Sequence, residues 1–174
     1  CALATIILAC VVITGWYLNL PLLIQTHPAL VPMQFNTALG FLMIGGGLLA
    51  VHAGWERTGL TLALAVGLLA ALTLLQYVTG RDFAIDQLLM RHYITVETSH
   101  PGRMAPNTAL CFLITGIALT FGFCKSLGRR TNFSVATLGS VVSGLGAVAF
   151  VGYLMDIETA YGWGYLTRMA VHTA

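Results

Sequence analysis

Charge is scarce in this sequence of 174 residues, because Asp, Glu, Lys and Arg together make up only 8% of it. A soluble domain usually carries about 25% charged residues. None of these residue types occurs before Glu56, and further uncharged stretches cover 58–80, 104–124 and 131–155. With a mean hydropathy of +0.85, a chain this short cannot hide its apolar surface from water. The shortage of charge excludes an ordinary soluble domain and indicates a membrane protein with the lipid bilayer as its partner.

Motifs of catalysis are lacking as well. The sequence contains no hydrolytic triad, phosphate-binding loop or HExxH motif, so this region is not expected to be an enzyme. The four cysteines form no CxxC pair and indicate no disulfide framework. The net charge of +2 is small and scattered, which argues against a nucleic-acid partner.

The uncharged stretches predict an all-α integral membrane fold, because a helix needs roughly 20 apolar residues to cross the hydrocarbon core. Five complete helices are expected, over residues 2–23, 35–52, 59–78, 106–123 and 132–155. A sixth is expected to start near residue 168 and to be truncated. Apolar residues recur three or four apart between 82 and 93, which predicts a short helix lying on the membrane surface.

One motif, Met-x-x-(Asn/His)-Thr-Ala, occurs three times: at 33–38 (first motif), 104–109 (second motif) and 169–174 (third motif). Each copy follows a helix expected to end near a tyrosine, and the gaps from Tyr17, Tyr77 and Tyr153 to the next Met are 16, 27 and 16 residues. Self-similarity of this kind indicates one structural unit used repeatedly. We therefore expect a single transmembrane domain, 1–174, forming a six-helix bundle of three two-helix repeats, about 1–58, 59–131 and 132–174.

Orientation follows from the loop charges, because cytoplasmic loops carry an excess of Lys and Arg. The loops after the second and fourth helices contain one acid, Glu56, against four bases: Arg57, Lys125, Arg129 and Arg130. The other loops contain five acids against four bases: Asp82, Asp86, Glu97, Asp156 and Glu158 against Arg81, Arg91, Arg103 and Arg168. The N-terminus is therefore expected in the cytoplasm, and the sixth helix would return the chain there.

The motifs are expected to meet near the outer surface. Their helix N-termini, with partly positive ends, would form a polar ligand pocket from Asn36, Thr37, Asn107, Thr108, His172 and Thr173. His172 replaces Asn in the third motif and would make the pocket titratable. The alternative is that these side chains cap helices and join them by hydrogen bonds.

A metal site is a second hypothesis for the outer side. Imidazole and thioether groups suit copper, and imidazole also binds zinc or haem iron. The candidate ligands are His27, His92, His100, Met104, Met169 and His172. Ordinary packing of methionines and loop positions before proline for His27 and His100 are the alternative. The sequence leaves the cofactor unknown, with haem and copper open.

Two segments resemble a known family. The phrase Gly102-Arg103-Met104-Ala105-Pro106-Asn107-Thr108-Ala109-Leu110-Cys111-Phe112-Leu113 and the third motif are similar to the N-terminal membrane region of bacterial signalling proteins that carry PAS, histidine kinase or diguanylate cyclase (GGDEF) modules. Residues 82–89 resemble the segment between the third and fourth helices of that family.

The resemblance implies a sensory or anchoring domain in the bacterial inner membrane. It would act as a homodimer and pass a signal through the sixth helix to a cytoplasmic output domain in cis after Ala174. Two alternatives stay open: a haem- or copper-binding membrane redox protein, and a transporter or subunit of a membrane complex.

Overall fold

The structure, a computed structural model, describes residues 2–94, 96, 98–123 and 128–174, with residues 128–131 described by their backbone alone. Cys1, Glu97, Cys124 and Lys125 lie outside the described residues. Five long helices follow one another in the described part: α1 (Ala2–Leu18), α3 (Phe35–His52), α4 (Glu56–Thr79), α5 (Pro106–Phe123) and α6 (Gly128–Met155). Three shorter elements are α2 (Pro21–Ile24), α7 (Glu158–Tyr161) and the 3-10 turn η2 (Val171–Thr173).

Four helices are long and apolar enough to cross a membrane: α3, α4, α5 and the 132–155 part of α6, with mean hydropathies between 1.4 and 2.2. Helix α1 is apolar but has only 17 residues. These lengths support the multi-pass membrane protein predicted from the sequence.

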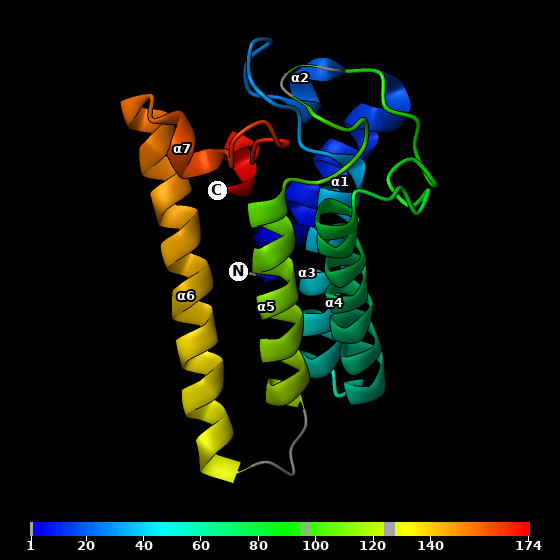
Figure 1. Cartoon of the computed structure of the whole chain (residues 1–174). Coiled ribbons are helices and arrows are strands. Elements are labelled where there is room, and N and C mark those ends of the chain that lie inside the picture. The colour runs from blue at the N-terminus through cyan, green and yellow to red at the C-terminus, as the bar shows by residue number, and fades with distance from the viewer. Residues whose placement is uncertain (1, 95, 97, 124–127) are drawn as a thin grey trace.

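The helices pack on their chain neighbours, α1 on α3, α3 on α4, α4 on α5 and α5 on α6. The segments that lead into the three motifs all lie at one end of the bundle, and the turn between α3 and α4 lies at the other (Figure 1). We name these segments the first connector (19–32), the second connector (80–103) and the third connector (156–168). The three connectors thus share one end of the bundle, as the sequence predicted for these loops.

The helix boundaries agree with the sequence where a break is encoded locally. Helices α3 and α5 begin and end at the predicted residues. The first helix is shorter than predicted because Asn19 turns the chain with a φ of 53°, after which Pro21 opens α2.

The prediction of a short helix between residues 82 and 93 is wrong. That segment consists of turns and bends in its described residues. Asp82 Oδ1 accepts a hydrogen bond from the backbone N–H of Ala84 (2.8 Å), and Ala84 has a φ of 58°. Such a local side-chain-to-backbone bond competes with helix formation.

Each motif contributes its methionine to a different core cluster. Met33 packs with Trp16 and Ile24, Met104 with Phe112 and Ala109, and Met169 with Tyr161 and Ala149. All three methionines are at most 2% exposed. The core of the molecule therefore lies directly beneath the connectors.

Candidate functional site

An aromatic side chain near the end of a long helix binds each motif. Trp16 Nε1 donates a hydrogen bond to the carbonyl of Met33 (2.9 Å), and Tyr77 Oη donates to the carbonyl of Met104 (3.0 Å). Tyr153 Oη donates in the same way to the carbonyl of Met169. Each bond joins the end of one helix to the start of the motif that follows it.

The chain turns at the same distance from each of these aromatic residues. Asn19, Gly80 and Asp156 stand three positions after Trp16, Tyr77 and Tyr153 and have φ angles of 53°, 66° and 56°. This left-handed conformation is costly for most residues, and glycine, asparagine and aspartate tolerate it best. In the sequence, Tyr17 was matched with Tyr77 and Tyr153 as the residue near the helix end. In the structure Tyr17 is 62% exposed, and the buried Trp16 makes the equivalent bond.

The polar residue of each motif lies against a connector other than the one that leads into that motif. Asn36 Nδ2 donates a hydrogen bond to the carbonyl of Ile85 in the second connector (3.0 Å). Asn107 Nδ2 donates to the carbonyl of Tyr161 in the third connector (3.1 Å). Both asparagines are buried, and their amides tie α3 and α5 to connectors that are distant in the sequence.

His172 occupies the corresponding position in the third motif and lies against the backbone of Ile24, in the first connector. Burial lowers the pKa of His172, and the Ile24 backbone raises it by a smaller amount. Neither ring nitrogen makes a hydrogen bond of regular geometry within the described residues. The ring of His172 therefore contacts the backbone of Ile24 without a hydrogen bond of regular geometry. No charged side chain contributes to this pKa shift.

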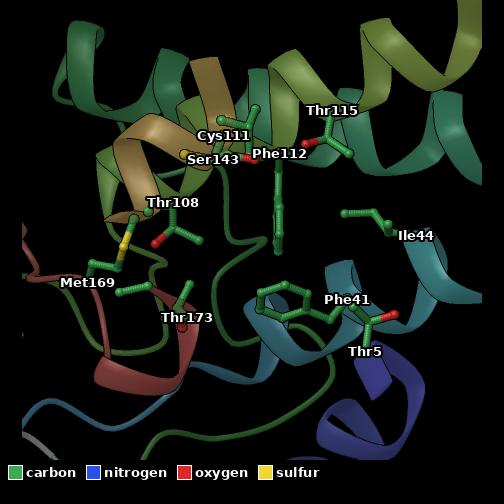
Figure 2. A pocket seen from close by; sticks show the side chains of 13 residues that line it. Thr5, Phe41, Ile44, Thr108, Cys111, Phe112, Thr115, Ser143, Met169 and Thr173 are labelled. Carbon is green, nitrogen blue, oxygen red and sulfur yellow. The ribbon is translucent and has the colours of Figure 1, made fainter. Parts of the chain in front are cut away.

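Two of the predicted ligand residues, Thr108 and Thr173, line a cavity of about 250 Å³ together with Met169. The other walls come from α1 (Thr5), α3 (Phe41, Ile44), α5 (Cys111, Phe112, Thr115) and α6 (Val142, Ser143, Gly146), with Ala174 at one side. Figure 2 shows Thr108, Met169 and Thr173 toward one end of this space and Ile44 and Thr5 toward the other. Asn36, Thr37, Asn107 and His172 are not part of its lining.

The predicted metal ligands are spread over the connector end of the molecule. His27 is exposed in the first connector, while His92 faces the ring of Trp16 (5.2 Å between centroids) and His100 faces that of Tyr77 (6.2 Å). Met104 and Met169 lie in separate core clusters. Among the described residues, no group of three or more His, Cys, Asp or Glu side chains is arranged to hold a metal ion.

A buried ion-pair cluster holds the second connector against α4. Arg103 Nε lies 2.7 Å from Asp86 Oδ2, and Gln76 Nε2 donates to the same oxygen (2.9 Å). Arg103, Asp86 and Gln76 are each at most 7% exposed. In the sequence, Asp86 counted only as one of the loop acids that set the orientation. The available signal was Arg103 itself, which stands directly before Met104 as Arg168 stands before Met169.

The third connector carries a weaker counterpart of this pair. Arg168 Nη2 lies 2.8 Å from Glu158 Oε2, but the Glu158 side chain is 64% exposed. Both arginines also lie over a tyrosine ring, Arg103 over Tyr77 (5.4 Å) and Arg168 over Tyr161 (5.9 Å). The buried pair should therefore matter far more for stability than the exposed one.

Comparison of the chain with protein-family models, with curated proteins and with solved structures gave no match.

Replacing Arg103 with Ala is expected to destabilise the protein by about 3–5 kcal/mol, because it leaves the Asp86 carboxylate buried without its cation. Arg168→Ala is the matched control and should cost about 1 kcal/mol or less, since its partner is exposed. The free energy of unfolding, measured by denaturant titration in detergent micelles, distinguishes the two variants. Equal losses in both would show that the Arg103 pair is no more important than a surface contact.

The stability of the protein should fall in mild acid. Burial lowers the pKa of His92 to about 4, so the folded state takes up its proton less readily than the unfolded state. The contribution of His92 to the free energy of unfolding is complete above about pH 6.5, the ordinary histidine pKa, and is lost as the pH falls toward 4. Because His92 is partly exposed, we expect a loss of about 1–2 kcal/mol between pH 7 and pH 5.

His92→Phe keeps a ring against Trp16 and removes the titration. Thermal denaturation at pH 7 and pH 5 should therefore show a smaller acid shift in this variant. An unchanged acid shift would assign the pH dependence to another group.

Proposed function

We propose that this chain is the membrane-embedded sensory and anchoring domain of a bacterial signal-transduction protein. In this proposal three helix pairs and their connectors form the domain, with α1–α3, α4–α5 and α6 plus a following helix as the pairs. The sixth helix leads from the third motif to a cytoplasmic kinase or diguanylate cyclase. The protein works as a homodimer in the inner membrane with its N-terminus in the cytoplasm.

The repeated contacts around the motifs support the three-pair organisation. An aromatic donor, a left-handed residue and a buried methionine recur with the same mutual arrangement in all three copies. The first and third connectors share further detail, because Met33 donates its backbone N–H to the carbonyl of Ile24 and Met169 donates to that of Tyr161, both at 2.9 Å.

The third motif is also shaped like the start of a helix. Helices α3 and α5 begin two residues after Met33 and Met104, and η2 begins two residues after Met169. The residue before α3, Gln34, has φ −65° and ψ 148°, and the residue before η2, Ala170, has φ −70° and ψ 148°. A helix continuing from η2 would be entered in the same backbone conformation as α3.

In the proposal that helix packs beside α6, most of whose surface is left uncovered. Only 11% of the membrane-spanning window of α6 is buried, against 44% in α3 and in α5. The cavity of about 250 Å³ lies between α1, α3, α5 and α6, immediately beside Ala174. A helix entering this space would bury the small residues of α6 that face it, as close helix packing in membranes favours.

The observation that carries the sensory proposal is the position of the third motif in the wall of this cavity. Met169, Thr173 and Ala174 meet residues of four helices there. A change in the packing of those helices would therefore act directly on the segment that leads toward the output. Signalling requires a stimulus that favours one of two such arrangements over the other.

Sequencing the gene downstream of the codon for Ala174 tests the proposal. We expect about 20 further apolar residues, enough for one crossing, followed by a PAS, histidine kinase or GGDEF module. A reading frame that ends directly after the sixth helix would contradict the sensory function. A frame that continues without a PAS, histidine kinase or GGDEF module would also contradict it.

A further inference from the structure

The second connector is longer than the other two and does more than join two helices. It spans 27 residues from Tyr77 to Met104, against 17 from Trp16 to Met33 and 16 from Tyr153 to Met169. The shorter connectors make the same bond between aromatic side chain and methionine carbonyl. The additional residues are therefore not needed to connect a helix pair, and insertions in one copy of a repeat often serve binding.

The additional length encloses a polar pocket of about 480 Å³. Its walls are made by Asp82, Ala84, Asp86, Gln87, Leu88, His100, Pro101 and Arg103, all from the second connector. The third connector carries a comparable Arg168–Glu158 pair without such additional residues around it.

The charges in the pocket do not balance. Arg103 is committed to Asp86 at 2.7 Å and lies 3.8 Å from Asp82. One guanidinium thus faces two carboxylates, and the Asp82 side chain is 74% exposed. The pocket has a surplus of negative charge that a cationic ligand would neutralise.

Hydrogen-bond acceptors are also in excess. Asp86 Oδ1 and Gln76 Oε1 are buried and have no hydrogen-bond donor within the described residues. Their side chains are joined, because Gln76 Nε2 donates to Asp86 Oδ2 (2.9 Å). Buried acceptors without donors are costly. Of the two residues only Asp86 lines the pocket, so a ligand that brings an N–H group would satisfy Asp86 Oδ1.

We propose that this pocket binds a small molecule through a primary ammonium group. An ammonium carries one positive charge and three N–H donors, which match the surplus carboxylate of Asp82 and the unpaired Oδ1 of Asp86. A metal ion fits less well, because among the described residues no group of three or more His, Cys, Asp or Glu side chains is arranged to hold one, and Arg103 stands in the wall. The ammonium can belong to a free amine or to the headgroup of phosphatidylethanolamine.

Binding is tested by isothermal titration calorimetry on the whole chain in nanodiscs of phosphatidylcholine, whose headgroup nitrogen has no N–H. The probes are ethanolamine, putrescine and glycine, with tetramethylammonium as a cation without N–H donors. We expect saturable binding of at least one primary amine. The affinity for tetramethylammonium should be lower by about tenfold or more.

Two variants locate the site. Asp82→Asn removes the exposed carboxylate and leaves the buried Arg103–Asp86 pair intact, so it should weaken amine binding about tenfold or more without unfolding the protein. Glu158→Gln removes the exposed acid of the third connector and should leave binding unchanged. Nanodiscs of phosphatidylethanolamine distinguish the sources: loss of amine binding there assigns the site to the lipid headgroup, and retention assigns it to a free amine.

The proposal is overturned if none of the three amines binds at millimolar concentration to the folded protein. Equal affinity for tetramethylammonium, or unchanged amine affinity in Asp82→Asn, would also overturn it. This inference rests on the proposed three-pair organisation only because that organisation identifies the second connector as unusually long. The binding measurement itself needs no output domain. Amine binding together with a gene that lacks an output module would keep this inference and remove the sensory function.

Discussion

The fold depends on one interaction made three times, a hydrogen bond from an aromatic side chain at a helix end to the backbone carbonyl of a buried methionine. Trp16, Tyr77 and Tyr153 each make it. A buried backbone carbonyl outside regular structure needs a hydrogen-bond donor, because leaving it unpaired is costly. The aromatic side chain supplies that donor and at the same time buries its ring against the core. The bond fixes where each connector returns to the bundle, and therefore where the next helix begins.

Contacts between the motifs and distant connectors follow from this placement. Once the connectors are held in position, Asn36 and Asn107 reach the carbonyls of the next connector, and His172 lies against Ile24 in the first. The contacts thus run from the first motif to the second connector, from the second motif to the third connector, and from the third motif to the first connector. In the proposed sensory domain, the third of these contacts belongs to the segment that leads toward the output.

The sequence was informative where a structural feature is encoded by neighbouring residues. Uncharged stretches bounded by proline or charge predicted α3 and α5 to the residue, whereas packing of the motif methionines was only the alternative to a metal site. The connectors were harder to predict because their geometry depends on distant partners. The segment after α4 has helical periodicity, yet Asn36, which is 49 residues away, binds its backbone at Ile85. Arg103 and Asp86 were each visible as charges, but only their burial in one cluster with Gln76 shows what they do.

The central claim is that a helix after the third motif occupies the space between α1 and α6. Spin labelling of the full-length gene product tests it most directly, with cysteines introduced for Ser143, which lines the cavity, and for Val141, which is 45% exposed on another face of α6. The native cysteines are first replaced, since Cys10 and Cys111 are free thiols. The account predicts that the label at 143 is immobile and shielded from oxygen dissolved in the lipid, while the label at 141 is accessible. Equal accessibility at both positions would show that no helix fills this space.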